Sequence, residues 1–444
     1  MKVAILGYST LEQSESIDAY NFYHAKGDEI TIYYWEGGTQ AADLPGGVTA
    51  KLTKDEHTFL DLDDFDMIVR SAFVHPKDIR TTKPVTTIYN EFMALCPAPV
   101  IGVTGTKGKG TTSSLIAKML EAAGNNVFLA GNIGKPPLSL LPQITTKSYV
   151  ILELSSFQLI DFKYAPHVGV CLMVVPEHLN WHTDLTEYLQ SKGNLYVNQT
   201  PDDIVVYNMF NKNSDDLTTV SKAKRIGYAV ADTGEKVPDG ANAYVLGDTI
   251  YYGQQEVCKT SDVALLGRHN LENCCAAIAA VWELLHGNID AIVSVLKTFT
   301  GLEHRLELVR ELDGVKYYDD SFATTPETAV AALLSFTQPL VMIVGGSDKG
   351  IPFDELANAI AKQAPKVVLA IGQTGPKIAE LIKARGYSNV ILENLENMEQ
   401  IITASKAHTT PGDVVLLSTG CASFGMFKDY KDRGNQFKTA VQAL

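Results

Sequence analysis

The feature that most constrains this chain is a glycine- and lysine-rich loop between a short apolar run and a helical pattern. Residues 100–103 are apolar, Gly105-Thr-Lys-Gly-Lys-Gly-Thr-Thr112 follows, and residues 113–123 have the pattern of a helix. A strand, a glycine turn and a helix in this order allow backbone N–H groups and a helix amino terminus to bind phosphate. The loop therefore predicts a nucleotide-phosphate site in an α/β domain.

The loop matches the general phosphate-loop pattern imperfectly. Val103 stands where that pattern has its first glycine, and Gly110 stands where Ser or Thr follows the lysine. We still expect Lys109 to reach the β- and γ-phosphates, and Thr111 or Thr112 to offer a hydroxyl to Mg²⁺. A glycine-rich turn without a ligand remains the alternative.

Length and composition indicate a multidomain globular protein. The chain has 444 residues, a length that predicts two or three domains. Hydrophobic residues make up 45% and charged residues 20%, which excludes a largely disordered protein. The net charge of −14 argues against a general nucleic-acid or membrane-binding face. The six cysteines form no C-x-x-C pair, and no apolar run approaches a membrane span or signal peptide. We therefore expect a cytoplasmic protein.

Apolar runs and amphipathic stretches alternate along the chain. The runs at 3–6, 100–103, 150–154, 341–344, 367–371 and 414–417 predict buried, largely parallel strands of an α/β architecture. Prolines at 97 and 99, and Gly301, suggest domains over 1–95, 96–298 and 299–444. The segment 201–262 is rich in Asp, Asn and Gly, which favours an irregular or hairpin region before a helix at 270–285.

Several further motifs make the chain recognisable. They are Gly105-Thr-Lys-Gly-Lys109, Glu153-Leu-Ser-Ser-Phe-Gln158, Glu177-His-Leu-Asn-Trp-His182, Gly267-Arg-His-Asn-Leu-Glu-Asn273, His304-Arg-Leu-Glu307, Asp320-Ser-Phe-Ala-Thr324 and Gly345-Gly-Ser-Asp-Lys-Gly350. Together they resemble the Mur ligase superfamily, which also includes folylpolyglutamate synthases. The segment Leu417-Ser-Thr-Gly-Cys-Ala-Ser-Phe424 with Arg433-Gly434 is most similar to the D-glutamate-adding branch.

The resemblance implies three domains and one reaction. A Rossmann-like domain at 1–95 would bind a UDP-sugar, a central P-loop ATPase-type parallel sheet domain would bind ATP, and a Rossmann-like C-terminal domain would bind the amino acid. The implied enzyme is an ATP-dependent, ADP-forming ligase of peptidoglycan synthesis that uses Mg²⁺. It would join D-glutamate to UDP-N-acetylmuramoyl-L-alanine through an acyl phosphate. We expect a monomer without nucleic-acid or membrane partners.

The same resemblance assigns roles to individual residues. For catalysis it implies Lys109, His178, Lys192 and Glu153; for metal binding, Thr111, Glu153, His178 and a carbamylated Lys192. For ATP it implies Gly105, Thr106, Lys107, Gly108, Lys109, Gly110, Thr111, Thr112, Asn270, Asn273, Arg305 and Asp320. For the other substrates it implies Thr10, Leu11, Ser71, Asn132, Thr324, Lys349, Ser423, Phe424 and Tyr430.

The residue types alone leave other interpretations open. Glu153 could be a solvated residue at a strand end, Lys192 a surface lysine, and either asparagine a helix cap. Arg305 could form a surface ion pair with Glu303 or Glu307. His178 and His182 have the four-residue spacing of a helical metal site, but Pro176 favours a loop, which argues against zinc.

Four positions depart from the pattern of the family. Met173 replaces the usual Asn, Glu177 the usual Asp, and Phe322 the usual Lys, while Gly110 is more typical of the folate branch. These departures leave two alternatives: a related ligase with another amino acid or folate, and a nucleotide-binding regulatory protein without catalysis. The separate domain ahead of the ATP loop argues against the folate branch, which lacks it.

Overall fold

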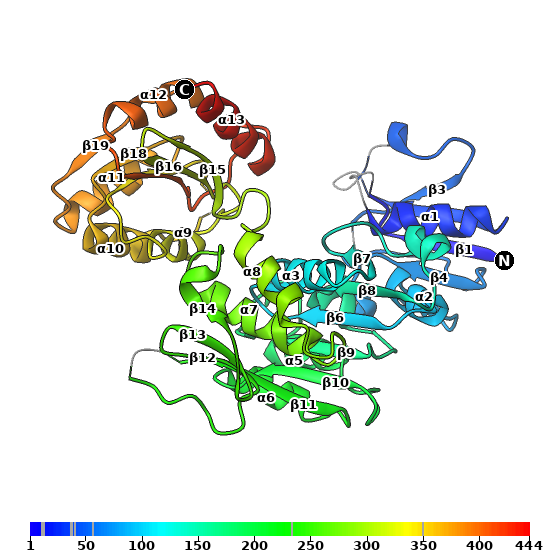
Figure 1. The fold of residues 1–444 in the computed structure, drawn as a ribbon. Helices are drawn as coiled ribbons and strands as arrows, with labels where there is room; N and C mark the ends of the chain where they lie inside the picture. Colours follow the sequence, from blue (N-terminus) through cyan, green and yellow to red (C-terminus); the bar gives the residue numbers. More distant parts are fainter. Residues whose placement is uncertain (10–13, 36–38, 40, 56, 232–233, 349) are drawn as a thin grey trace. The chain divides into compact units, whose positions relative to one another are not determined.

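The computed structural model describes residues 1–9, 14–35, 39, 41–55, 57–231, 234–348 and 350–444 (Figure 1). The chain divides into two compact units, Met1–Asp262 with Leu271–Lys297, and Val263–Asn270 with Thr298–Leu444. Three sheets account for the strands, two in the first unit and one in the second. The predicted α/β class with three Rossmann- or ATPase-like sheets is confirmed, and the exact domain boundaries stay a prediction.

The first sheet is parallel throughout, in the order β3-β2-β1-β4-β5. Its strands are β1 (Lys2–Leu6), β2 (Glu29–Tyr34), β3 (Thr49–Leu52), β4 (Met67–Arg70) and β5 (Val85–Thr86), accompanied by helices α1 (Glu15–Ala25) and α2 (Ile88–Leu95). The strand order reverses between β1 and β4. In open α/β sheets, ligands bind at such a switch point, beyond the carboxyl ends of the strands.

The central sheet has nine strands in the order β14-β13-β12-β11-β10-β9-β6-β8-β7. They are β6 (Val100–Thr104), β7 (Asn126–Gly131), β8 (Ser148–Glu153), β9 (Val168–Cys171), β10 (Ile204–Asn208), β11 (Lys224–Val230), β12 (Ala243–Leu246), β13 (Thr249–Tyr252) and β14 (Gln255–Lys259). Strands from β7 to β12 pair in parallel, whereas β12, β13 and β14 form an antiparallel meander.

The region 201–262 is more regular than the sequence suggested. The hairpin expectation is confirmed for β12 to β14, but the same segment also supplies β10 and β11, which extend the parallel sheet. Helices of the first unit outside the first sheet are α3 (Lys109–Ala122), α4 (Ser156–Leu159), α5 (Leu185–Gly193), α6 (Lys212–Thr218) and α8 (Ile289–Thr298); α7 (Arg268–Val281) begins in the residues of the second unit.

The sheet of the second unit has the order β15-β16-β20-β17-β18-β19 and is parallel except for the β15–β16 pair. Its elements are β15 (Glu307–Leu312), β16 (Val315–Asp319), β17 (Leu340–Val344), β18 (Val367–Ala370), β19 (Val390–Leu392), β20 (Val414–Leu417), α9 (Pro326–Leu333), α10 (Asp354–Gln363), α11 (Gly375–Ala384), α12 (Met398–Ala407) and α13 (Tyr430–Gln442).

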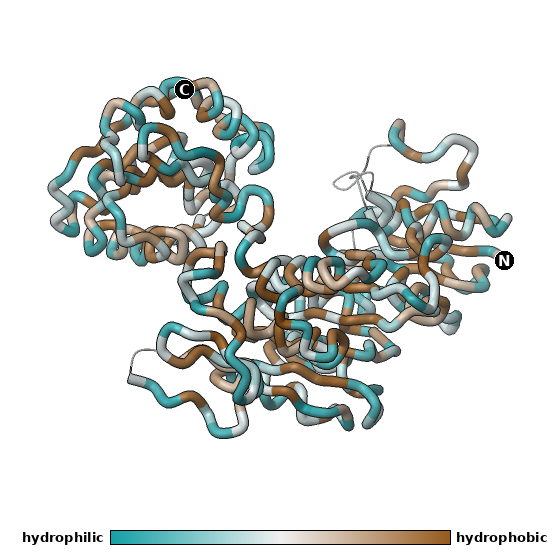
Figure 2. The backbone as a smooth tube through the Cα atoms, viewed as in Figure 1, coloured by the Kyte–Doolittle hydropathy of each residue, from teal (hydrophilic) through white to brown (hydrophobic). Residues whose placement is uncertain are grey.

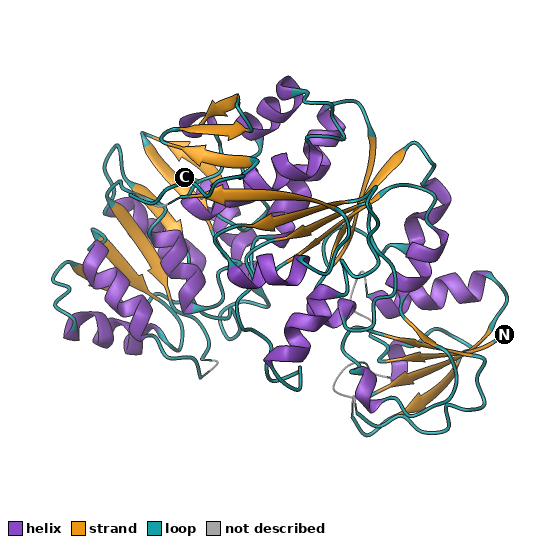
Figure 3. Cartoon of the chain, turned by 90° about the horizontal axis from the view of Figure 1, so that it is seen from below, coloured by secondary structure: helices purple, strands orange, loops and turns teal. Residues whose placement is uncertain are grey.

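The predicted apolar runs fall on β1, β6, β8, β17, β18 and β20, and only the runs 150–154 and 367–371 extend one residue beyond their strands. On β17, Met342 and Val344 pack into one core while Val341 and Ile343 pack into the other, so the strand is buried on both faces. Figure 2 shows the hydrophobic segments following the strands, and Figure 3 shows helices along the sheets. Among the described residues, no helix has the length and apolar character needed to cross a membrane.

Buried polar contacts join the first sheet to the central sheet within the first unit. Asp18 on α1 accepts N–H groups from Leu138 and Ser139, at 2.8 and 2.9 Å. Burial outweighs these two bonds and raises the pKa of Asp18 to about 6. The fully buried Arg70 at the end of β4 donates from Nε to Asp161 at 2.7 Å and makes a second bond to the same carboxylate.

Candidate active site

The loop between β6 and α3 requires glycine at two positions. Gly105 has φ 152° and Gly108 has φ 86°. A Cβ at Gly105 would lie 2.6 Å from the Cβ of Leu172, and one at Gly108 would lie 2.3 Å from Oδ1 of Asn273. The loop therefore passes close to its neighbours while α3 begins at Lys109, so the helix amino terminus follows the loop directly.

Lys109 and Lys192 converge on this loop. Lys109 Nζ donates to the carbonyl oxygens of Gly105 and Thr106, at 3.2 and 3.1 Å, and Lys192 Nζ donates to Gly105 at 2.9 Å. Lys192 lies on α5 and is only 2% exposed, so the surface-lysine interpretation is wrong. Burial, followed by the charge of Lys109, lowers the pKa of Lys192 to about 7.

Glu153 lies at the carboxyl end of β8, opposite Val103 on the neighbouring β6. It is 2% exposed, so the solvated interpretation is wrong. The charge of Glu153 acts on Lys192, and a buried carboxylate is a hard oxygen ligand of the kind that Mg²⁺ prefers. The hydroxyl of Thr111, also buried, lies in the first turn of α3.

His178 lies on the loop after β9 (Val168–Cys171), as Pro176 suggested. It has φ 58°, its ring centroid lies 4.8 Å from that of Phe157, and burial lowers its pKa. The preceding Glu177 forms an ion pair with Lys107 at 2.7 Å. Burial opposes ionisation of Glu177, but the hydrogen bond from Lys107 prevails and lowers its pKa. Lys107 therefore neutralises the acid that departs from the family pattern.

His182 belongs to a separate buried network rather than to a metal pair with His178. Its Nε2 lies 2.9 Å from Ser156 Oγ and its Nδ1 3.3 Å from Glu187. Burial lowers the pKa of His182 to about 4, which keeps the imidazole neutral. Glu187 also meets His75, at 3.1 Å, so it fixes two imidazoles. The sequence analysis missed Glu187, and only its position three residues after Asp184, a helix cap, distinguished it.

The predicted uridine-nucleotide residues lie partly at the switch point of the first sheet. A Cβ on Gly7, which follows β1, would lie 2.4 Å from Oγ of Ser71, which follows β4. The buried Ser71 hydroxyl has no hydrogen-bond partner within the described part of the chain. Thr10 and Leu11 lie outside the described residues.

Asn132 follows β7 beside the β8 terminus. Its N–H donates to the carbonyl oxygen of Glu153 at 3.0 Å, and the residue is exposed. Gly131 and Gly134 on either side have positive φ, and a Cβ on either would lie 2.2 Å from a backbone oxygen. This close contact between backbone segments brings Asn132 next to Glu153.

The two predicted adenine asparagines lie inside α7, which begins at Arg268, so the capping interpretation is wrong for both. In the first unit, Asn273 Oδ1 accepts from Thr112 Oγ1 at 3.2 Å, which ties it to the phosphate loop. In the second unit, Asn270 Nδ2 donates to the carbonyl oxygen of Leu266 at 2.7 Å.

In the second unit, two residues predicted to bind ATP lie near the carboxyl end of β16: Asp320 follows that strand, and Arg305 precedes β15, whose first residue pairs with Asp319. Asp320 is buried and accepts from Ser418 Oγ at 2.7 Å and from the N–H of Leu306 at 3.2 Å; burial raises its pKa to about 7. Arg305 places its guanidinium carbon 3.8 Å from the ring centroid of Phe322. The neighbouring acids Glu303 and Glu307 both form ion pairs with Lys438.

The predicted amino-acid residues differ in exposure. Ser423 is buried, Thr324 and Tyr430 are half-buried, and Phe424 is exposed; Lys349 lies outside the described residues. The sequence analysis missed Arg433 as a structural centre of this region. It is fully buried and donates to Ser321 Oγ at 2.9 Å and to two carbonyl oxygens. Its presence beside Gly434 in a quoted motif was the available signal.

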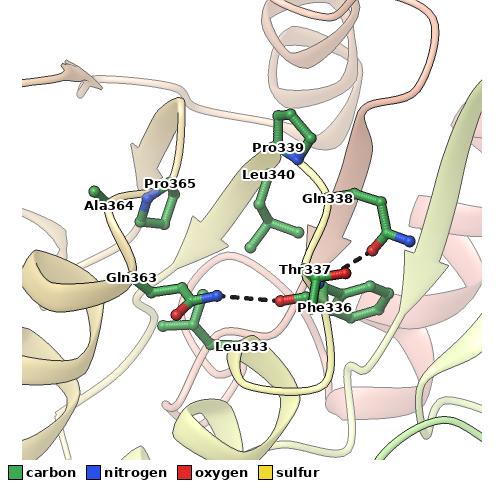
Figure 4. A pocket seen from close by; sticks show the side chains of 9 residues that line it. All are labelled: Leu333, Phe336, Thr337, Gln338, Pro339, Leu340, Gln363, Ala364 and Pro365. Carbon is green, nitrogen blue, oxygen red and sulfur yellow. Dashed lines mark hydrogen bonds between the residues drawn. The ribbon is translucent and has the colours of Figure 1, made fainter.

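A cavity of about 220 Å³ lies elsewhere in the second unit (Figure 4). Its lining residues are Leu333, Phe336, Thr337, Gln338, Pro339, Leu340, Gln363, Ala364 and Pro365. Leu340 begins β17, whereas Asp320 follows the carboxyl end of β16, and both strands run parallel to β20. The cavity therefore lies at the amino ends of the parallel strands, opposite the end where Asp320 lies. It has no charged lining residue and does not suit a nucleotide.

Comparison with known families matches most of the chain. Residues 103–281 match the Mur ligase middle domain, and residues 304–421 match the Mur ligase, glutamate ligase domain. The chain is 41% identical to the UDP-N-acetylmuramoylalanine--D-glutamate ligase of Symbiobacterium thermophilum, over 79% of this chain and 76% of that protein. It is 35% identical to the protein of the same name from a Roseiflexus species, over 95% of each chain.

Solved structures show the same fold at lower identity. The UDP-N-acetylmuramate-alanine ligase of Thermotoga maritima aligns with a TM-score of 0.63 at 17% identity, covering 100% of this chain and 99% of that one. A MurF ligase of Thermotoga maritima, solved with ADP, aligns with a TM-score of 0.59 at 18% identity, covering 99% and 95%.

Proposed function

This chain belongs to the Mur ligase family of ATP-dependent amide-forming ligases, and from that premise we propose that it joins D-glutamate to UDP-N-acetylmuramoyl-L-alanine in peptidoglycan synthesis. The observation that carries the proposal is the 35% identity, over 95% of both chains, to a relative named for that reaction. The buried Glu153 and Lys192 beside the phosphate loop give that identity a chemical basis.

The proposed reaction has two steps. The alanyl carboxylate takes the γ-phosphoryl group of ATP, which gives an acyl phosphate and ADP. The amine of D-glutamate then attacks the acyl carbon and forms a C–N bond. The C–O bond to the phosphate breaks, phosphate leaves with the electron pair of that bond, and the nitrogen loses a proton. Such chemistry depends on positioning and on charge neutralisation. Lys109 and the loop 105–112 are suited to this task because they combine positive charge with a helix amino terminus.

Mg²⁺ fits the residues beside the loop and would neutralise phosphate charge. We propose that Glu153, Thr111 and His178 hold it. Lys192 can join them only as a carbamate, formed when its neutral amine bonds to the carbon of CO₂ and releases a proton. Its burial and its pKa of about 7 support this modification, because a substantial fraction of the amine is then neutral near pH 7.

The remaining assignments are proposals of the same kind. Arg305 binds a phosphate of ATP, Asp320 contacts its ribose, and Asn270 and Asn273 contact adenine. Ser71 and Asn132, with Thr10 and Leu11, bind the uridine nucleotide substrate. D-Glutamate is bound by the group Thr324, Lys349, Ser423, Phe424 and Tyr430. The monomeric state, the cytoplasmic location and the absence of nucleic-acid or membrane partners stay predictions from the sequence.

Phosphate release tests the proposal. The assay uses UDP-N-acetylmuramoyl-L-alanine, ATP and Mg²⁺ with a panel of D- and L-amino acids, and a parallel series with folates. We expect release with D-glutamate, and its loss in Lys109→Ala while Lys118→Ala, an exposed lysine on the same helix, retains activity. Turnover only with another amino acid or a folate would correct the substrate. No turnover with any acceptor, despite ATP binding, would refute the ligase function in favour of a regulatory one.

A further inference from the structure

Arg305 lies between two non-glycine residues with left-handed backbone conformations. His304 has φ 62° and Leu306 has φ 46°. Both are held by buried polar contacts, since His304 Nδ1 lies 2.7 Å from Asp319 Oδ2 and the N–H of Leu306 donates to Asp320 at 3.2 Å. Such conformations persist where the surroundings over-determine them, and they cluster at functional sites. The backbone of Arg305 is therefore fixed in place.

The guanidinium of Arg305 is positioned as well. Its central carbon lies 3.8 Å from the ring centroid of Phe322, which is stacking distance. The ring of Phe322 in turn meets Tyr430 edge-on, with centroids 5.1 Å apart and an interplanar angle of 86°. The three side chains thus contact one another in the order Arg305, Phe322, Tyr430, with Phe322 in the middle.

Hydrogen bonds also anchor the loop that carries Phe322. The N–H of Phe322 donates to the carbonyl oxygen of His304 at 2.9 Å. Ser321 Oγ donates to the carbonyl oxygen of Tyr430 at 2.7 Å, and the buried Arg433 donates to Ser321 Oγ at 2.9 Å. Phe322 nevertheless remains 38% exposed, which is unusual for a side chain whose purpose is to fill a core.

We propose that Phe322 is a positioning residue that holds the guanidinium of Arg305 flat and presents its N–H edge to a phosphate of ATP. A guanidinium stacked on a ring makes its hydrogen bonds in its own plane, which is the geometry of bidentate phosphate binding. Fixing the side chain beforehand also reduces the rotamer freedom lost on binding. This inference rests on the proposed role of Arg305 in binding ATP. Phe322 therefore does more than remove the charge of the usual Lys, because its ring contacts the guanidinium of Arg305.

A double-mutant cycle tests this role in the full-length enzyme. The variants are Phe322→Leu, Phe322→Tyr, Arg305→Ala and the double variant Arg305→Ala with Phe322→Leu. The measurements are the dissociation constant of ATP, by competition with a fluorescent ATP analogue, together with kcat, KM for ATP and the thermal midpoint. Leucine keeps an apolar side chain but removes the π face, and tyrosine keeps that face.

We expect Phe322→Leu to weaken ATP binding about 3- to 20-fold, Phe322→Tyr to stay within about twofold, and Phe322→Leu to have no further effect once Arg305 is alanine. A purely structural role would instead give the same loss in both backgrounds, and would overturn the inference. So would unchanged ATP binding in Phe322→Leu while Arg305→Ala binds weakly, a result that leaves the proposed function intact. Unchanged binding in Arg305→Ala would refute the phosphate contact itself, while phosphate release by the unmodified enzyme still tests the ligase function separately.

Discussion

Replacing Lys192 by methionine should change how the stability of the protein depends on pH. Lys192 is 2% exposed, and its pKa is lowered from 10.5 to about 7, chiefly by burial. Lys192→Met removes this buried cation, and Gly105 keeps Lys109 Nζ as a donor to its carbonyl oxygen, at 3.2 Å. We therefore expect the variant to be more stable than the parent at pH 6 and inactive in phosphate release.

The magnitude follows from linkage. A pKa about 3.5 below its unfolded value disfavours the protonated folded state by roughly 5 kcal/mol, at 1.36 kcal/mol per unit of pKa. Between pH 7 and 10.5 the unfolded chain keeps a proton on Lys192 that the folded protein has lost, so stability rises with pH by about 1.4 kcal/mol per pH unit. At pH 7 about half of the folded protein still has Lys192 protonated, so the slope is smaller there. From pH 7 to pH 9 the free energy of unfolding of the parent should therefore rise by about 2 kcal/mol relative to that of Lys192→Met. Below pH 7 both states are protonated, and the difference levels off.

Urea unfolding followed by tryptophan fluorescence measures this difference. Both proteins are unfolded at pH 6, 7, 8 and 9 in buffer stripped of CO₂, which prevents carbamylation of the parent. The control is Lys118→Met, at a side chain that is 57% exposed, and its stability should follow that of the parent across this range. A parent-minus-variant difference that stays constant within about 0.5 kcal/mol from pH 7 to pH 9 would refute a buried, depressed Lys192.

Two further predictions concern stability. Asp161→Ala leaves the fully buried Arg70 without its carboxylate and should lower the free energy of unfolding of the first unit by about 3–5 kcal/mol. The control Asp216→Ala, in the exposed Lys–Asp pair of α6, should lower it by less than about 1 kcal/mol. Equal losses for the two variants in urea unfolding would contradict this expectation. Gly434→Ala places a Cβ 2.2 Å from His304 Nδ1 in a fully buried setting, so we expect the free energy of unfolding to fall by about 2–4 kcal/mol and the activity to decrease. An unchanged thermal midpoint would contradict this prediction, because it would mean that α13 moves aside without loss of stability.

The strands that are buried on both faces could be predicted from the sequence, because continuous apolar runs such as 100–103 and 341–344 are typical of such strands. Prediction was less successful for residues 201–262, where polar turns separate the strands and β12, β13 and β14 have only four or five residues each. Local composition resembles a loop there, and only the pairing of β10 with β9 and of β11 with β10 shows that these strands continue the parallel sheet.

The candidate site was predictable as far as motifs extend. The loop glycines and Lys109 follow from local geometry, and family motifs supplied Glu153 and Lys192. Their burial could not be predicted, since most lysines and glutamates are exposed and the cause is tertiary packing. Likewise Phe322 and Arg305 are 17 positions apart in the sequence and meet because β16 and the turn before β15 are neighbours.

The polar contacts between the first two sheets have a consequence for synthesis of the protein. Asp18 and Arg70 leave the ribosome before their partners, which lie at residues 138, 139 and 161. At 5–20 residues per second, roughly 3 to 13 seconds separate residue 95 from residue 161. During that interval all five strands of the first sheet have been synthesised, but the partners of the Asp18 carboxylate and the Arg70 guanidinium have not. The first sheet can therefore complete its polar contacts only after β8, the third strand of the central sheet in chain order, has been translated.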